Sequence, residues 1–380
     1  MRVVIAPDSF KESASAAAVA EAIASGWRRI FPNAALILVP MADGGEGTVD
    51  ALVAATGGSK IEVTACGPLG EPVQAVYGLL GNGQTAVIEM AAASGLPLVP
   101  PERRNAGITT TRGTGDLIRH ALDRGAKRMI LGIGGSATND AGAGMAQALG
   151  FSLLDVQGEE LSPGGLALAR LARIDGTRRH STLTACEILV ACDVTNPLCG
   201  RAGASHVYGP QKGATPAMAA ELDAALRHFS EIVEAQLGMH VIDMPGAGAA
   251  GGLGAGLVAF GGARLRPGVE LVAEACDLAG RMKGADLVIT GEGRLDAQTA
   301  HGKTPAGVAR IAKQFDIPVI ALAGALGDGC ESLYDSGIDA MFSICPKPMD
   351  LFECMAHTTE FLTDASEAIA RIWRSKPGSL

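Results

Sequence analysis

Aromatic residues are scarce in this sequence: Phe, Trp and Tyr together make up 4% of 380 residues. Hydrophobic residues nevertheless reach 48% and glycines number 51, so the apolar content is mainly Ala, Val, Leu and Ile, as expected for tightly turning α/β packing. A surplus of basic residues is also absent, because the formal net charge is −9. This acidic balance argues against a nucleic-acid partner. It leaves small anionic substrates open, since their sites need only a few cations or N–H groups.

Metal-binding and redox patterns are missing as well. The eight cysteines include no CxxC pair and the seven histidines no HExxH motif. We therefore predict neither a zinc site nor a disulfide framework, and we expect buried free thiols.

The sequence has no long hydrophobic run. The longest uncharged stretch, 244–263, contains eight glycines and is expected to be a buried, glycine-rich helix junction rather than a membrane span. The first residues, MRVVIAPDSF, hold an apolar run too short for a signal peptide. We therefore expect a cytoplasmic protein with no membrane partner.

At this length two domains are the natural expectation. Both chain ends alternate strands and helices in the manner of a parallel sheet. The expected elements are strands at 2–6, 35–40, 285–290, 317–324 and 339–344, and helices at 13–29, 46–55, 304–314, near 330 and at 350–373. We predict an α/β fold in which residues 1–58 and 281–380 form a Rossmann-like, doubly wound domain. Residues 59–280 would form an inserted mixed α/β domain, with the active site in the cleft between the two.

Within 59–280, short alternating runs up to about residue 90 predict antiparallel hairpins. Further expected elements are a strand at 127–133, a strand at 186–192, and helices at 113–125 and 215–237. The final residues, SKPGSL, are expected to form a disordered tail.

The most informative segment is GIGGSATNDAGAGMAQALG, residues 132–150, which joins a strand to a helix. Gly134 and Gly135 would let successive N–H groups approach an anion, and the following helix would add the positive end of its dipole. Ser136 and Asn139 could equally be capping and turn residues, which is their common use. Taken alone, the segment leaves both interpretations open.

Six other polar, glycine-bearing motifs lie where strands end or helices begin. They are APDSFKES with Asp8, Ser9 and Lys11; PMADGGEGT with Asp43, Gly44, Gly45 and Glu46; TTRGTGDLI with Thr111 and Arg112; ACDVTNPLCG with Asp193 and Asn196; YGPQKGAT with Gln211 and Lys212; and ITGEGRLDAQTAHGKTP with Glu292, Arg294, Asp296, Gln298 and Lys303. Open α/β sheets bind ligands at such positions. Together the motifs supply carboxylates, cations and N–H groups, which are the components that phosphoryl transfer needs.

Two further patterns resemble nucleotide-binding motifs but support them only weakly. GAGAAG at 246–251 fits GxGxxG, but Pro245 precedes it where a strand should end, so a nicotinamide dehydrogenase rests on weak support. AQTAHGKT at 297–304 lacks the first glycine of a P-loop.

These motifs, together with GAGAAGGLGAG, resemble those of the bacterial glycerate kinases of the type-I, two-domain kind, in the same order along the chain. The resemblance implies ATP-dependent phosphorylation of D-glycerate with Mg²⁺, at the 2-hydroxyl group, giving 2-phosphoglycerate. The alternatives are a kinase for the 3-hydroxyl group or for another small hydroxy acid, and a small-acid sensor without catalysis. Oligomeric state stays open, a homo-oligomer included.

Residue type and position then suggest roles. Asp193 and Asp296 are the expected general base and Mg²⁺ ligand, in either order. Lys11 and Arg294 would grip the glycerate carboxylate or the transferred phosphoryl group. The remaining motif residues named above would bind substrate or nucleotide.

Overall fold

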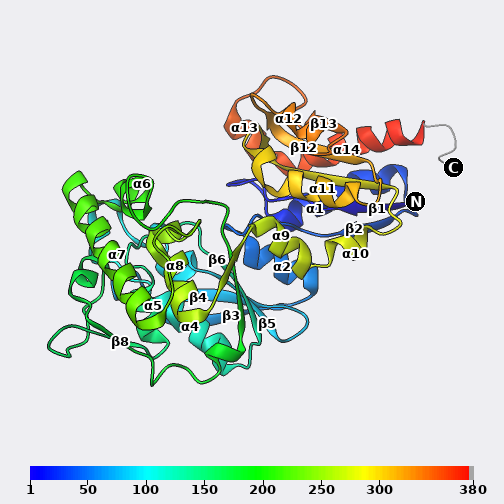
Figure 1. Ribbon diagram of the computed structural model, residues 1–380. Coiled ribbons are helices and arrows are strands. Elements are labelled where there is room, and N and C mark those ends of the chain that lie inside the picture. Colours follow the sequence, from blue (N-terminus) through cyan, green and yellow to red (C-terminus); the bar gives the residue numbers. More distant parts are fainter. Residues whose placement is uncertain (376–380) are drawn as a thin grey trace. The chain divides into compact units, whose positions relative to one another are not determined.

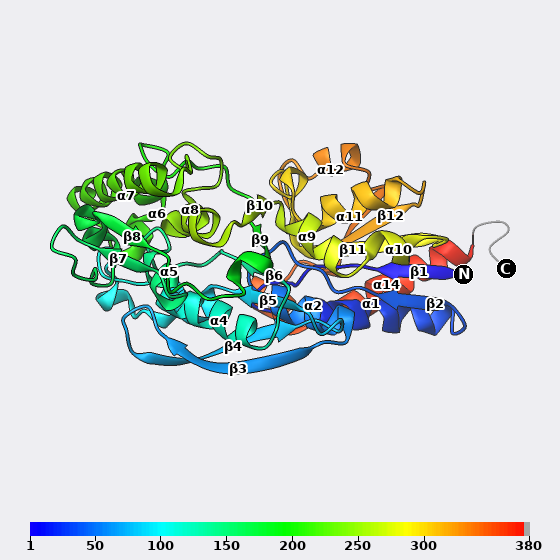
Figure 2. The same ribbon diagram turned by 60° about the horizontal axis from the view of Figure 1, so that its bottom comes forward.

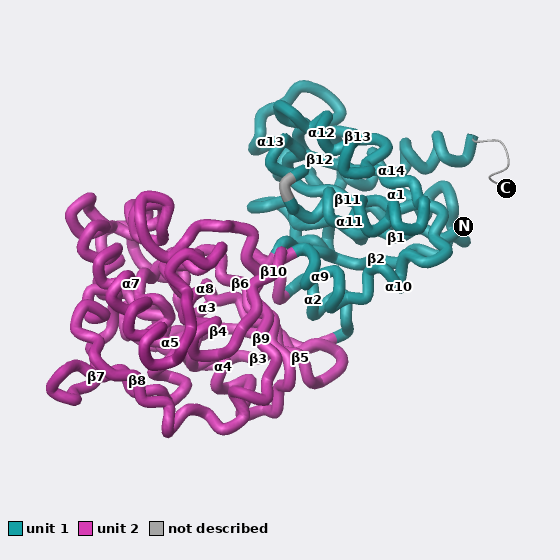
Figure 3. The backbone as a smooth tube through the Cα atoms, viewed as in Figure 1, with its two compact units in different colours: residues 1–43, 50–57, 269–380 teal, residues 44–49, 58–268 magenta. Residues whose placement is uncertain are grey.

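The computed structural model describes residues 1–375, except for the side chain of His301. All but the first residue of the predicted SKPGSL tail therefore lie outside the described residues. The chain divides into two units, which Figures 1 and 3 show. The first unit comprises 1–43, 50–57 and the chain from Val269 on, and the second comprises 44–49 and 58–268.

These boundaries depart from the expected residues. Residues 44–49 and Gly58 belong to the second unit, and residues 269–280 belong to the first. Helix α9 (Gly268–Ala275) lies against α11 (Thr304–Lys313), because a Cβ at Gly307 would come 2.5 Å from Cγ2 of Val269. The glycine leaves the space that the valine side chain fills.

The sheet of the first unit has five parallel strands in the order β13-β12-β11-β1-β2. These strands are β1 (Arg2–Ile5), β2 (Ala35–Leu38), β11 (Leu287–Leu295), β12 (Val319–Leu326) and β13 (Ala340–Ser343). This is the strand order of a doubly wound sheet: β2 is added on one side of β1, and β11, β12 and β13 are added in turn on the other side. The strand order therefore reverses between β1 and β11, while all five strands stay parallel. The predicted α/β fold, with a Rossmann-like sheet built from both chain ends, is confirmed.

Helices cover both faces of this sheet, as Figure 2 shows: α1 and α14 lie on one side and α9, α10 and α11 on the other. The helices are α1 (Ala16–Ile30), α2 (Thr48–Thr56, which crosses from the second unit), α9, α10 (Leu278–Met282), α11, α12 (Ser332–Asp335), α13 (Leu351–Ala356) and α14 (Thr358–Arg374), with the 3₁₀ turn η6 (Thr299–His301). The hydroxyl of Ser15 caps α1 by accepting from the N–H of Ala18, and the apolar face of the helix buries Val19, Ile23 and Trp27.

Two expected elements of the first unit differ from the structure. Strand β11 does not end at residue 290 but pairs with β12 as far as Leu295, so Glu292 and Arg294 are strand residues rather than loop residues. The terminal helix is two helices, α13 and α14, separated at His357.

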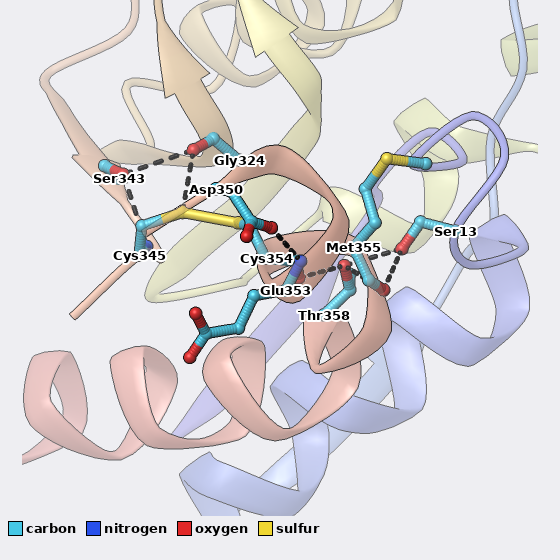
Figure 4. The surroundings of a disulfide bond; sticks show 9 residues. All are labelled: Ser13, Gly324, Ser343, Cys345, Asp350, Glu353, Cys354, Met355 and Thr358. Carbon is cyan, nitrogen blue, oxygen red and sulfur yellow. Dashed lines mark hydrogen bonds between the residues drawn. A yellow bond between two sulfur atoms is a disulfide. The ribbon is translucent and has the colours of Figure 1, made fainter. Parts of the chain in front are cut away.

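The expectation that all cysteines are free thiols is wrong for two of them. Cys345, which follows β13, forms a disulfide with Cys354 of α13, as Figure 4 shows. Nine positions separate them in sequence, a spacing outside any common motif, so only the fold brings the two together. The other six cysteines are free thiols.

The sheet of the second unit has six strands in the order β10-β9-β6-β5-β4-β3. They are β3 (Ser59–Cys66), β4 (Pro72–Leu79), β5 (Thr85–Glu89), β6 (Arg128–Gly132), β9 (Glu187–Ala191) and β10 (Arg264–Arg266), and β7 (Ser152–Leu154) pairs separately with β8 (Arg173–Asp175). Strands β3, β4 and β5 are antiparallel neighbours, as the alternating pattern predicted, whereas β5, β6, β9 and β10 run parallel.

The helices of this unit are α3 (Ala91–Ser94), α4 (Arg112–Asp123), α5 (Ala143–Ala148), α6 (Ala204–Tyr208), α7 (Pro216–Leu237) and α8 (Ala249–Gly261). The 3₁₀ turns are η1 (Leu96–Leu98), η2 (Pro101–Arg103), η3 (Gly165–Arg170), η4 (Leu183–Ala185) and η5 (Pro210–Lys212). The glycine-rich stretch 244–263 is a helix junction, as predicted, because α8 carries left-handed residues from Ala250 to Gly252. No helix among residues 1–375 is long and apolar enough to cross a membrane.

Candidate functional site

The point where the first unit's sheet reverses order carries two acidic side chains. Asp8 follows β1, and its N–H donates to the carbonyl oxygen of Gly291 over 2.8 Å. This bond sets Asp8 beside Glu292 of β11, although 284 residues separate them in sequence. Ligands of doubly wound sheets bind at this reversal.

Hydroxyl donors hold both carboxylates, with a backbone amide at Asp8 and an ammonium at Glu292. Thr304, the first residue of α11, donates its hydroxyl to Oδ2 of Asp8 over 2.5 Å, and the Ser9 N–H donates to Oδ1 over 2.6 Å. The hydroxyl of Thr299 donates to Oε1 of Glu292 over 2.5 Å. Lys303 places its ammonium 3.9 Å from the same oxygen.

Burial moves both acids toward neutral pH. Desolvation raises the pKa of Glu292 to about 7, against the lowering effect of Thr299 and Lys303. Desolvation likewise raises the pKa of Asp8 to about 6, although the Thr304 hydrogen bond opposes it. The negative charge of Asp43 raises the pKa of Asp8 and of Glu292 further, so the three acidic side chains influence one another electrostatically.

The other predicted residues of the first unit lie at the surface. Arg294 is exposed, and its Nε lies 3.4 Å from Oδ2 of Asp296. Asp296 also accepts from the backbone N–H of Gln298 over 3.0 Å, as in an Asx turn. Lys11 is exposed on the turn that follows Asp8 and Ser9.

In the second unit, the 134–140 turn follows β6. Gly134 and Gly135 are exposed, and Gly135 has a positive φ of 72°. Helix α5 begins only at Ala143 and has six residues, so it adds little dipole to the turn. The predicted anion site therefore depends on the turn itself rather than on the helix.

Asp140 anchors the far end of this turn. The fully buried carboxylate accepts from the N–H and hydroxyl of Thr111 over 2.8 and 2.9 Å, and from the N–H groups of Gly142 and Gly144. Burial raises its pKa, while those donors lower it. Thr111, predicted to bind a ligand, is committed to this anchor.

Lys212 is buried against the same turn, and Asn139 of the turn is likewise buried rather than open to solvent. The ammonium of Lys212 donates to Oγ of Ser136 and to the carbonyl oxygen of Thr138, each over 2.7 Å. Desolvation lowers its pKa to about 7, although Asp140 opposes that effect. Asn139 donates to the hydroxyl of Ser205 over 3.0 Å.

Gly44 and Gly45, the glycine pair of the PMADGGEGT motif, lie against this turn. A Cβ at Gly132 would come 2.3 Å from the carbonyl oxygen of Gly44, and one at Gly134 would come 3.8 Å from the Cα of Gly45. Only glycine permits the first of these approaches. Glu46 follows, exposed, and the chain then enters α2.

Four other predicted residues of this unit have different surroundings. Asp193, exposed after β9, accepts from the N–H of Gly268 over 3.0 Å. Asn196 donates to the Ala202 carbonyl and accepts from the Tyr208 hydroxyl, so both ends of its amide are engaged by the protein. Arg112 and Gln211 are exposed.

The sequence analysis assigned no site role to several residues at both places. Thr304 and Thr299 hold the two acids, and Asp140 and Ser205 hold the turn. A threonine directly before Pro305, at the start of a periodic apolar run, is a recognisable helix-start signal. Nothing in the sequence shows that its hydroxyl reaches Asp8.

The glycine-rich pattern GAGAAG proves to be part of the packing. No strand directly precedes it, and a Cβ at Gly251 would come 2.0 Å from the Thr138 carbonyl oxygen. The Ala141 N–H donates to the carbonyl oxygen of Gly251 over 3.1 Å. These glycines let α8 support the 134–140 turn, so the dinucleotide interpretation loses its only support.

Comparison with known proteins gives consistent results. The family model described as the glycerate kinase family matches residues 3–374. The chain is 55% identical over 370 residues to the glycerate kinase of Bacillus subtilis (strain 168), and 53% identical over 370 residues to the glycerate 2-kinase of Escherichia coli (strain K12). Each alignment covers 97% of both chains. The crystal structure of a proposed glycerate kinase 2 from Salmonella typhimurium LT2 superimposes with a TM-score of 0.92 at 51% identity, covering 99% of this chain and 98% of that one.

Proposed function

Since this chain belongs to the glycerate kinase family, we propose that it transfers the terminal phosphoryl group of ATP to the 2-hydroxyl group of D-glycerate, giving 2-phosphoglycerate and ADP. The relative named glycerate 2-kinase, 53% identical over almost the whole chain, supports the choice of hydroxyl group.

The main support for phosphoryl transfer is the pair of acids Asp8 and Glu292, which lies where the strand order reverses between β1 and β11. A general base works best when its pKa lies near the working pH, because it is then both ionised and basic. The buried carboxyl of Glu292, with a pKa of about 7, meets that condition. In this proposal Glu292 takes the proton of the substrate hydroxyl, and Thr299 and Lys303 hold its carboxylate.

The acidic donor set also fits Mg²⁺ bound with ATP. Residues 1–375 contain no group of three His, Cys, Asp or Glu side chains arranged to hold a metal ion. Mg²⁺ in kinases needs only one or two carboxylates, with phosphates and water completing its shell. Asp8 and Asp43 supply such oxygens beside Glu292, and the ion would neutralise charge on the phosphates.

Asp193 and Asp296 stay predicted site residues, now as contacts to a metal ion or a nucleotide rather than as the base. Asp193 is exposed and Asp296 is half-buried in a turn, and these settings suit such contacts better than proton transfer. Lys11 and Arg294 are exposed cations that could bind the glycerate carboxylate, and Gly134, Gly135 and Ser136 could bind an anionic group.

ADP release measured across a panel of small hydroxy acids tests this proposal. We expect turnover with D-glycerate, and we expect Asp193→Asn and Asp296→Asn to lower it, because each variant removes a carboxylate assigned to the metal ion or the nucleotide. Replacing the base Glu292 should cost about 10²- to 10⁴-fold. Binding of D-glycerate without any ADP release would instead indicate the sensor alternative.

A further inference from the structure

Hydrogen bonds from neighbouring segments hold several residues of the 134–140 turn. The carbonyl oxygen of Ala137 accepts from the Thr109 hydroxyl over 2.8 Å, and the N–H of Ala137 donates to the carbonyl oxygen of Ser94 over 3.0 Å. Asn139 and Asp140 are held by Ser205 and Thr111, as described above. Such a turn is preorganised, so binding an anion requires little ordering of the backbone.

Lys212 contributes a cation to this framework. Its side chain is 1% exposed, so it cannot meet a ligand directly from solvent. The amine reaches two positions of the turn, at Ser136 and Thr138, from the segment that also carries Ser205. A buried lysine is rare in proteins because its charge must be desolvated, which points to a specific role.

The direction of the Ser136 bond defines that role. Ser136 accepts from the Lys212 amine through Oγ, so its own hydroxyl hydrogen is left to point elsewhere. Ser136 is 7% exposed and directly follows the exposed Gly134 and Gly135. A hydroxyl that accepts from a cation is a stronger donor toward an anionic oxygen.

We propose that Lys212 is a positioning residue: it does not touch the substrates, but orients and polarises Ser136 so that this hydroxyl donates to an anionic group bound at Gly134 and Gly135. The inference rests on the proposed function only for the identity of that anion, which is a phosphate of ATP or the carboxylate of D-glycerate. Lys212 was predicted from sequence as a direct ligand, and its burial is the reason for this different role.

Calorimetric binding of ATP and of D-glycerate, each titrated separately, tests the inference in a double-mutant cycle. Ser136→Ala removes the hydroxyl and Lys212→Met removes the amine with little change in side-chain length. We expect each single variant to weaken binding of one of the two ligands about 10- to 100-fold, as for a charge-assisted hydrogen bond. We expect the double variant to be no weaker than the single variants, because one acts through the other.

The exposed Lys127 of the same unit provides the matched control, and Lys127→Met should bind both ligands as the wild type does. The inference would be overturned if the losses of affinity in Ser136→Ala and Lys212→Met added up in the double variant. It would also be overturned if Lys212→Met bound both ligands as the wild type does. If Lys212→Met does not fold, Ser136→Ala together with Ser136→Thr decides. Threonine restores the hydroxyl and should recover binding, whereas failure to recover would contradict the role of the hydroxyl. If the wild-type protein binds neither ligand, the proposed function has failed instead.

Discussion

Replacing Glu292 by glutamine should remove most of the turnover and, in alkaline solution, make the first unit more stable. The carboxyl of Glu292 is nearly buried, and its pKa rises from an ordinary 4.5 to about 7. The folded state therefore binds this proton more tightly than the unfolded state does. The cost of ionising the group is absent below about pH 4.5, grows as the pH rises, and is complete above about pH 7.

The size of the effect follows from the same pKa values. At about 1.4 kcal/mol per pKa unit, the rise from 4.5 to about 7 corresponds to roughly 3 kcal/mol at pH 8.5 and to less than about 1 kcal/mol at pH 5. Glutamine is neutral at both pH values and can still accept from the Thr299 hydroxyl. We therefore expect Glu292→Gln to stabilise the protein by up to about 3 kcal/mol at pH 8.5 only.

Guanidinium unfolding followed by tryptophan fluorescence suits this test. Both tryptophans of the sequence, Trp27 of α1 and Trp373 of α14, belong to the first unit, as does Glu292. Glu331→Gln, an exposed acid of the same unit, is the control and should change stability little at either pH. Turnover should fall about 10²- to 10⁴-fold in Glu292→Gln alone. A variant that is equally destabilised at both pH values and retains turnover would contradict both the raised pKa of Glu292 and its role as the base.

Three further predictions concern the same unit. We expect the wild-type kcat/KM to fall as the pH drops from about 7 to 6, because Glu292 becomes protonated. Asp43 raises the pKa of both Asp8 and Glu292, so Asp43→Asn should shift that fall to lower pH. An unchanged pH profile would contradict this effect of Asp43. Removal of divalent cations with EDTA should abolish ADP release and added Mg²⁺ should restore it, whereas full activity in EDTA would exclude the proposed metal. Replacing Cys345 and Cys354 by serine should lower the free energy of unfolding by about 2–3 kcal/mol, as expected for a short closed loop, and a reductant should weaken only the wild-type protein. A wild-type protein that the reductant leaves unchanged would contradict the last prediction.

Local patterns in the sequence predicted the elements well where hydrophobic periodicity was strong. The hairpins formed by β3, β4 and β5 and the long amphipathic helix α7 follow directly from the spacing of apolar residues and from turn residues. The end of β11 was not predicted, because Gly291, Gly293 and charged neighbours resemble a loop. Pairing with β12 outweighs that local preference.

The site was harder to predict because its contacts are distant in sequence. Asp8 was singled out by its position after a strand, but its pairing with Glu292 depends on sheet order, which no local motif specifies. Lys212 was recognised as part of a motif, yet a lysine is almost always exposed, so its burial could be learned only from packing. The motifs thus supplied candidate residues, whereas the fold determines their protonation and their access to solvent.

We propose that this chain phosphorylates D-glycerate at the 2-hydroxyl group. Phosphorus and proton NMR of the product formed from ATP and D-glycerate tests it most directly, because the coupling identifies which carbon carries the phosphate. We expect 2-phosphoglycerate as the product, formed together with an equal amount of ADP. A 3-phosphoglycerate product, or ADP release that does not depend on D-glycerate, would contradict it.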